Sequence, residues 1–179
     1  MYNDVMERND VHIEPLRAEH AGELSAMVNA VFDEFVGGGY SAEGVRTFKE
    51  YVESDSIARR LQDGNLIYVA VAGSRIVGVI EIRSLDHVSL LFVVKEFHRR
   101  QIARRLLDYA IAECRKRSST FSALTVNASP YSETIYARLG FRATGNLQET
   151  NGIQYIPMER VFGESIDRST GRLTDSACC

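Results

Sequence analysis

The stretch VSLLFVVKEFHRRQIARRLL, residues 88–107, decides the fold of this chain. Residues 87–94 are almost continuously apolar, which is typical of a central β-strand covered on both faces. From Ile102 the apolar residues recur at helical spacing, and this pattern predicts a helix that ends near Lys116 or Arg117. A buried strand, a short basic loop and the start of a helix therefore follow one another along the chain.

The start of that helix has the chemistry of an anion site. The first N–H groups of a helix have no partner within the helix and carry a partial positive charge, so they attract phosphate groups. Arg99, Arg100 and Arg104 add positive charge at the same place. Basic runs often form only a solvated helix face, but the position of this one directly after a central strand favours a diphosphate site.

The segments before the central strand predict a meander. Leu66 to Val71 and Ile76 to Arg83 are apolar strands, and the turn Ala72-Gly73-Ser74 joins them as an antiparallel hairpin. The central strand follows almost at once. Three successive strands argue against a doubly wound nucleotide-binding fold, in which strands and helices alternate from the start.

Further elements flank this meander on both sides. Before it, we expect a strand at Val11 to Leu16 and helices at Ala18 to Phe35, Ser41 to Val52 and Ile57 to Leu61. After the basic loop and its helix, we expect a strand at Ala123 to Val126, a helix at Tyr131 to Leu139 closed by Gly140, and strands from Phe141 and from Gln154 to Phe162. The order predicts one α/β (α+β) domain over residues 1–162, and residues 163–179 read as a polar tail that need not pack.

Composition and charge restrict the function. Hydrophobic residues make up 45% and charged residues 25% of the chain, as in an ordinary globular domain, and the net charge is −3. An acidic chain is a poor general binder of nucleic acid, which requires an excess of Lys and Arg. The sequence shows neither a signal peptide nor a membrane-spanning run, so we expect a cytoplasmic protein without nucleic-acid or membrane partners. The cysteine spacing fits no metal site, and no metal is expected.

A second motif lies towards the end of the predicted domain, where residues 135–141 read Ile-Tyr-Ala-Arg-Leu-Gly-Phe. Its Tyr-x-x-Leu-Gly-Phe pattern and the basic loop together resemble the GNAT superfamily of acyl-coenzyme A N-acyltransferases. The pyrophosphate loop of that superfamily reads Arg/Gln-x-x-Gly-x-Gly/Ala, and His98, Gln101 and Ala103 stand at its three defined positions. Ala103 fits the pattern, whereas His98 replaces Arg or Gln and Gln101 replaces a glycine.

The resemblance covers nearly the whole chain except the tail. It implies a central mixed, mostly antiparallel sheet of about seven strands flanked by about four helices. It also implies transfer of an acetyl group from acetyl-CoA to a primary amine of a small molecule or peptide, by direct attack in a ternary complex. Dimers are common in the superfamily, so the resemblance allows a homodimer. A non-catalytic acyl-CoA-binding regulatory module is the alternative, because Gln101 and Ser129 depart from the pattern.

The resemblance also implies a set of cofactor-binding residues. Backbone N–H groups of the strand from Phe92 to Val94 would hold the thioester carbonyl, and a splay between this strand and the one after its helix would admit the pantetheine arm. Ser129 stands where the family often has Asn. The full set is Phe92, Val93, Val94, His98, Arg99, Arg100, Gln101, Ile102, Ala103, Arg104 and Ser129.

Two catalytic roles are expected. The resemblance implies that Tyr136 is the general acid that protonates the leaving thiolate, and an ordinary tyrosine pKa near 10 suits that role because the phenol stays protonated at neutral pH. The incoming ammonium must also lose a proton. For this base we hypothesise Glu81, an acidic side chain in the strand beside the central one, with Asp86 and His87 as the alternatives.

Overall fold

The computed structural model describes residues 10–162, 164–166 and 173–175. Eight strands form one sheet in the order β1-β2-β3-β4-β5-β8-β6, with β7 paired to β8. Their bounds are β1 (Val11–Pro15), β2 (Leu66–Ala72), β3 (Arg75–Arg83), β4 (His87–Val93), β5 (Ala123–Ala128), β6 (Arg142–Ala143), β7 (Gln148–Thr150) and β8 (Ile153–Val161). Every pair is antiparallel except β4 with β5. The expected mixed, mostly antiparallel sheet is confirmed.

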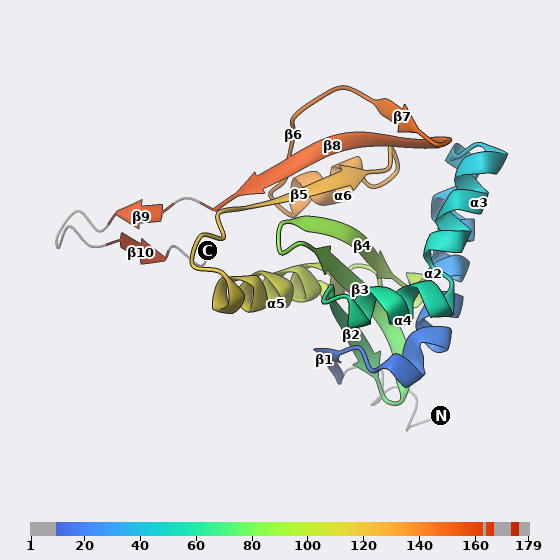
Figure 1. Ribbon diagram of the computed structural model, residues 1–179, viewed down its shortest axis with the longest axis horizontal. Coiled ribbons are helices and arrows are strands. Elements are labelled where there is room, and N and C mark those ends of the chain that lie inside the picture. Colours follow the sequence, from blue (N-terminus) through green and yellow to red (C-terminus); the bar gives the residue numbers. More distant parts are fainter. Residues whose placement is uncertain (1–9, 163, 167–172, 176–179) are drawn as a thin grey trace.

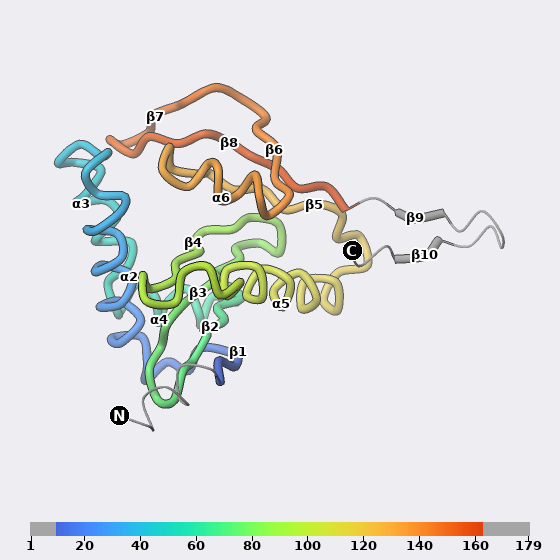
Figure 2. The backbone as a smooth tube through the Cα atoms, turned by 180° about the vertical axis from the view of Figure 1, so that it is seen from behind, coloured from blue at the N-terminus to red at the C-terminus, as the bar shows by residue number. Residues whose placement is uncertain are grey.

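Five α-helices in the described part of the chain flank this sheet (Figure 1). They are α2 (Ala21–Phe35), α3 (Ala42–Tyr51), α4 (Ser54–Gln62), α5 (Ile102–Arg117) and α6 (Glu133–Arg138). Gly78 of β3 lies against Leu106 of α5 on one face of the sheet. Glu81, three residues along β3, points to the other face and meets Arg60 of α4. Helices α4 and α5 therefore cover opposite faces of the sheet. Figure 2 views the molecule from behind, and there α5 lies in front of the strands.

The strands β2 and β3 form the centre of the core. All residues from Leu66 to Val71 and from Ile76 to Ile82 are buried. This burial is what a strand covered on both faces requires, and it explains why both runs are nearly continuous in apolar residues. Glu81 is the charged exception in these runs, and its carboxylate needs partners within the protein.

The strands β4 and β5 meet at one end and then separate. They pair only at His87 with Thr125 and at Val88 with Val126, although both strands continue further. The β3–β4 register shifts so that Ser89 is an extra residue on β4. Such a bulge bends its strand. The expected splay is therefore present, and Figure 1 shows β5 and β8 diverging from β4.

The ends of several elements differ from the sequence-based expectation. The helix expected from Ala18 begins as a 3₁₀ turn (Ala18–His20) that precedes α2. The helix expected from Tyr131 begins at Glu133, because the N–H of Ser132 bonds to the carbonyl of Ser129 (2.8 Å) and closes a turn there.

Of the predicted tail, the structure describes two short strands. They are β9 (Glu164–Ile166) and β10 (Leu173–Asp175), which pair antiparallel with each other. The rest of residues 163–179 lies outside the described residues. That this segment is a polar tail that need not pack stays a prediction.

Candidate active site

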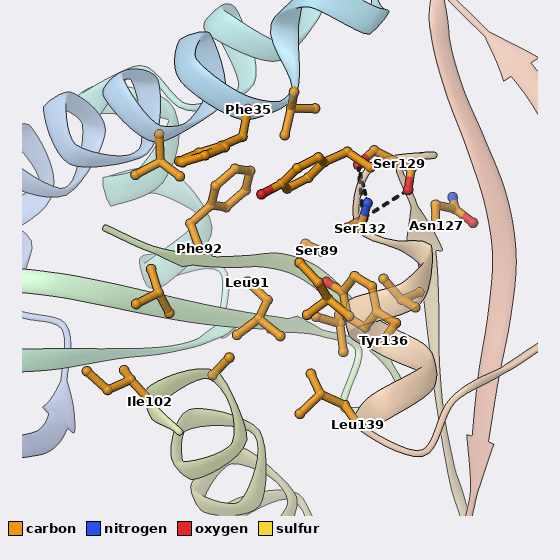
Figure 3. Close-up of a pocket in the computed structure, with 18 of the residues that line it drawn as sticks. Phe35, Ser89, Leu91, Phe92, Ile102, Asn127, Ser129, Ser132, Tyr136 and Leu139 are labelled. Atoms are coloured by element: carbon orange, nitrogen blue, oxygen red, sulfur yellow. Dashed lines mark hydrogen bonds between the residues drawn. The ribbon is translucent and has the colours of Figure 1, made fainter. Parts of the chain in front are cut away.

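The separation of β4 and β5 opens into a cavity of about 800 Å³. Its walls come from both strands and from helices α2, α3, α5 and α6 (Figure 3). Tyr136 of α6 and Leu139, which directly follows this helix, project into it, and Ile102 marks the start of α5. The cavity joins the predicted diphosphate loop to the predicted catalytic tyrosine.

Most of the site residues predicted from the sequence line this cavity, namely Phe92, Val93, His98, Arg99, Gln101, Ile102, Ala103, Arg104, Ser129 and Tyr136. Val94, Arg100 and Glu81 are not among the lining residues. The N–H of Val94 bonds to the carbonyl of Val77 (3.0 Å), so it is not open to a thioester carbonyl. The guanidinium of Arg100 stacks on the ring of Phe97, 5.0 Å from its centroid.

The loop between β4 and α5 has a strained backbone. Arg99 and Gln101 both have positive φ angles, +61° and +59°. This left-handed conformation costs an L-residue roughly 1–2 kcal/mol, whereas glycine adopts it freely. Gln101 occupies the position at which the superfamily pattern has glycine. The loop thus follows the backbone course that glycine would allow, with a side chain present.

This loop exposes the first N–H groups of α5 to the cavity. The first hydrogen bond of the helix runs from the N–H of Arg105 to the carbonyl of Gln101 (2.9 Å). The N–H groups of residues 102–104 therefore have no partner within the helix. Arg99 and Arg104 line the same end of the cavity. Free N–H groups and two guanidinium groups suit a diphosphate.

His98 braces the loop against β4. Its Nε2 lies 2.8 Å from the carbonyl oxygen of Val93, and the ring must donate this bond because a carbonyl only accepts. The ring also packs against Phe35, with centroids 5.3 Å apart. The residue that replaces the Arg or Gln of the pattern thus ties the loop to the end of the central strand.

Tyr136 is enclosed by protein, with only 6% of its surface exposed. Its ring meets Phe141 edge-on, with centroids 5.4 Å apart. Burial, with a smaller contribution from Tyr40, raises the pKa of Tyr136. The phenol therefore keeps its proton at neutral pH and can donate it, or a hydrogen bond, to a group that lies between β4 and β5.

Ser129 holds the turn that leads into α6. Its Oγ lies 2.9 Å from the Oγ of Ser132 and accepts the N–H of Ser132 at 3.3 Å (Figure 3). The side chain that stands in place of the family's Asn is thus engaged within the protein. It lines the cavity while bound to its own turn.

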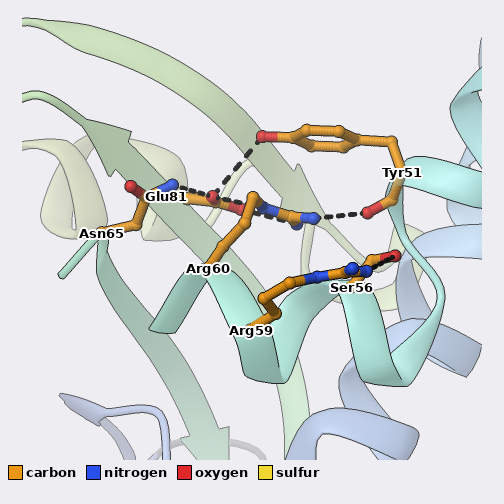
Figure 4. A network of polar contacts seen from close by, with 6 residues as sticks. All are labelled: Tyr51, Ser56, Arg59, Arg60, Asn65 and Glu81. Carbon is orange, nitrogen blue, oxygen red and sulfur yellow. Dashed lines mark hydrogen bonds and ion pairs between the residues drawn. The ribbon is translucent and has the colours of Figure 1, made fainter. Parts of the chain in front are cut away.

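Glu81 lies outside the cavity in a buried polar network (Figure 4). Its carboxylate is fully buried. Arg60 donates to both carboxylate oxygens (2.8 and 3.1 Å), and the amide of Asn65 donates to Oε1 (2.7 Å). The hydroxyl of Tyr51 lies at the limit of hydrogen bonding, 3.5 Å away. These hydrogen bonds tie α4 and the turn that follows it to β3.

His87, one of the two alternatives to Glu81, does line the cavity. Its Nδ1 lies 2.8 Å from the Oγ1 of Thr125, and that hydroxyl donates to the carbonyl of Asp86 (3.1 Å). Nδ1 must then donate to Thr125, which leaves the lone pair on Nε2. Burial, followed by the charge of Arg83, lowers the pKa of His87. The neutral ring can therefore accept a proton at neutral pH.

Sequence reasoning did not single out Ser89, Arg83 or Tyr51, which also line the cavity. Ser89 is the extra residue of the bulge in β4. A lone serine within an apolar run was the signal that could have indicated an irregularity there. Arg83 and Tyr51 carry no such local signal, because the fold alone brings them to the site.

Comparison with known families decides the classification. The family model described as "Acetyltransferase (GNAT) domain" matches residues 38–162, which is more than half of the chain. The chain belongs to the GNAT acetyltransferase family. It is therefore an N-acetyltransferase that takes its acyl group from coenzyme A. No curated protein sequence gives a significant match to this GNAT chain.

Solved structures show the same fold. A GCN5-related N-acetyltransferase from Rhodopseudomonas palustris is 23% identical, with a TM-score of 0.72 over 84% of this chain and 94% of that one. PaiA N-acetyltransferase from Thermoplasma acidophilum, solved with coenzyme A, is 20% identical, with a TM-score of 0.69 over 86% and 99%. An aminoglycoside 6'-N-acetyltransferase, also with coenzyme A, is 14% identical, with a TM-score of 0.58 over 84% and 96%. At such identities the GNAT fold is what is shared.

Two features are absent from the part of this GNAT chain that the structure describes. None of its helices there is both long and apolar enough to cross a membrane. Within the same ranges, no group of three or more His, Cys, Asp or Glu side chains could hold a metal ion. The expectation of a metal-free reaction stays a prediction.

Proposed function

We propose that this acetyltransferase moves an acetyl group from acetyl-CoA to a primary amine of a small molecule or peptide, by direct attack within a ternary complex. The observation that carries the proposal is one continuous cavity that runs from the start of α5, past Tyr136, to His87. Its two ends can hold donor and acceptor at the same time. A cytoplasmic location stays a prediction from the sequence.

The donor end is built for an anion followed by an extended chain. The N–H groups of residues 102–104, with Arg99 and Arg104, would hold the diphosphate. Beyond Val88, the edge of β4 that faces β5 has no paired strand among the described residues. Backbone N–H groups alternate along a strand, and that of Val94 faces β3, so that of Phe92 also faces β3. The N–H groups of Leu91 and Val93, on the open edge, are therefore the candidates to hold the thioester carbonyl.

The reaction needs one proton acceptor and one proton donor. The amine nitrogen forms a bond to the thioester carbon, and the carbon–sulfur bond breaks. We assign the proton of the amine to Nε2 of His87, reached through intervening water, in place of the hypothesised Glu81, because His87 lines the cavity and Glu81 does not. Tyr136 gives its proton to the departing thiolate. His87 then releases its added proton to solvent, and Tyr136 takes up a proton from solvent.

An acetyl relay through Cys114 is disfavoured by the surroundings of this residue. This side chain is fully buried in α5 and does not line the cavity. Burial raises its pKa to about 11, so the nucleophilic thiolate is scarce at neutral pH. Direct attack by the amine requires no such group.

The experiment that tests the proposal is thiol release from acetyl-CoA, measured with and without a panel of primary amines. Amine-dependent release, with an acetylated amine found by mass spectrometry, is the expected result. Tight binding of acetyl-CoA without turnover of any amine would instead support the non-catalytic acyl-CoA-binding module.

A further inference from the structure

The end of the cavity near His87 carries an arginine that the donor does not need. Arg83, the last residue of β3, is the cross-strand partner of His87 and lines the cavity. The diphosphate loop follows the other end of β4, which is roughly 20 Å away for a strand of this length. Arg83 therefore belongs to the part of the cavity that receives the acceptor.

The charges along the cavity are all of one sign. Its described lining contains the arginines Arg83, Arg99, Arg104 and Arg138 and no aspartate or glutamate. Arg104 donates to the carbonyl of Arg138 (2.9 Å), which places these two at the α5–α6 side. A polycationic acceptor needs carboxylates to neutralise its ammonium groups, and this lining offers it none.

Arg83 has no ion-pair partner within 4.0 Å among the residues that the structure describes. Its charge nevertheless reaches the cavity, since it helps to lower the pKa of His87. A guanidinium binds a carboxylate through two parallel hydrogen bonds, and its planar fork gives this pairing more specificity than an ammonium would.

Aromatic side chains line the cavity from Tyr51, whose hydroxyl is within reach of the charge of Arg83, towards Phe92 further along β4. Phe48 and Phe92 pack with ring centroids 5.8 Å apart, and both line the cavity with Tyr51. The ring of Tyr51 is fixed from behind by Arg60, whose guanidinium lies 3.8 Å from its centroid. Such walls suit the apolar body of a ligand, with a few polar groups to fix its orientation.

From this arrangement we infer that the acceptor is an amino-acid-like molecule, a primary amine that also carries a carboxylate, which Arg83 binds while aromatic side chains hold the apolar body. The inference rests on the proposed function and names its substrate class. The positive surroundings also favour the uncharged form of the amine, which is the nucleophile.

The test compares carboxylates with their neutral amides. Phenylalanine, leucine, 6-aminohexanoate and 4-(aminomethyl)benzoate are each assayed beside the corresponding amide, with spermidine as a polycation. We expect the preferred acid to exceed its amide at least about tenfold in kcat/KM, mainly through KM. Arg83→Gln should reduce this ratio to about one, chiefly by raising the KM of the acid. The matched variant Arg75→Gln, at the other end of β3, should keep the wild-type ratio.

As a control for folding, the binding of coenzyme A to each variant is measured by calorimetry. Equal rates with acids and amides, a preference for spermidine, or an unchanged ratio in Arg83→Gln would overturn the inference and leave the acetyltransferase proposal standing. Absence of thiol release with every amine would count against the proposed function itself, and with it the inference.

Discussion

At the scale of single residues, the phenol of Tyr136 is the group on which the proposed proton donation depends. Tyr136→Phe removes one oxygen from a buried side chain and keeps the ring that packs on Phe141. We expect kcat to fall about a hundredfold, because general acid catalysis contributes on this order. The dissociation constant of acetyl-CoA should change little. Tyr155→Phe, outside the cavity lining, is the control, and an unchanged kcat in Tyr136→Phe would remove the residue from the mechanism.

His87 predicts a pH dependence. Its pKa in the folded protein is below the ordinary value of 6.5, because burial and Arg83 disfavour the charged ring. With both substrates saturating, kcat should therefore fall on acidification with a midpoint below pH 6.5. His87→Gln should lower kcat about a hundredfold and abolish this acidic limb. An acidic limb that survives in His87→Gln would assign the base elsewhere, and exposed His12→Gln serves as the control.

The same pKa shift also has a consequence for stability. His87 is harder to protonate in the folded than in the unfolded chain, so its contribution favours the folded state fully above pH 6.5. That contribution is lost as the pH falls through the folded-state pKa. In His87→Gln the acid-induced loss of stability should be smaller than in the wild type.

Glu81 is expected to act on stability. Glu81→Gln leaves Arg60 beside a neutral amide in a site where the carboxylate was fully buried. Breaking a buried ion pair in this way costs about 3–5 kcal/mol. Chemical denaturation should show this loss, whereas the exposed Glu50→Gln should show almost none. If Glu81 were the catalytic base, its variant would instead lose the acidic limb of the pH–rate profile while remaining folded.

Residue roles followed from the sequence only where a motif marked them. Tyr136 was predicted because Gly140 and Phe141 stand at fixed offsets from it. Glu81 was hypothesised from its strand alone, and a strand pattern does not show that Arg60 and Asn65 reach the carboxylate from α4 and the following turn. The two faces of a strand differ only through their tertiary partners, which local patterns do not encode.

At the scale of elements, the loop between β4 and α5 carries the next prediction. Gln101→Gly should stabilise the protein by about 1 kcal/mol, because the residue has a φ of +59° that glycine adopts freely. Coenzyme A affinity should be kept or increased. Gln101→Ala retains the Cβ and should give no such gain, which separates the backbone effect from the loss of the side chain. A destabilised Gln101→Gly would show that the Gln101 side chain matters more than the strain.

Element types were predictable from periodicity, whereas caps marked the start of α3 at Ser41 and the end of α6 at Gly140. The helix α5 has the predicted bounds because its apolar stripe and its basic last turn are both present in the sequence. Gly140 closes α6 as predicted, and its φ of +91° is one that glycine adopts freely. The bulge at Ser89 was not predicted, because a lone serine in an apolar run can indicate an irregularity without showing which residue lacks a cross-strand partner.

At the scale of the whole molecule, one irregularity creates the site. The strands β1 to β4 and the strands β5 to β8 form one sheet, but only two residue pairs join its halves through β4 and β5. The diphosphate loop, the phenol of Tyr136 and the imidazole of His87 all lie along the gap that remains. The strand order could be inferred from the resemblance to the superfamily, whereas the acceptor end could not, because Arg83 and Tyr51 meet there only in the folded chain.

The most direct measurement of the central claim is a crystal structure with coenzyme A bound. We expect the diphosphate on the N–H groups of residues 102–104, the pantetheine arm between β4 and β5, and the sulfur within hydrogen-bonding distance of the Tyr136 hydroxyl. A diphosphate bound elsewhere, or a sulfur remote from that hydroxyl, would contradict the claim.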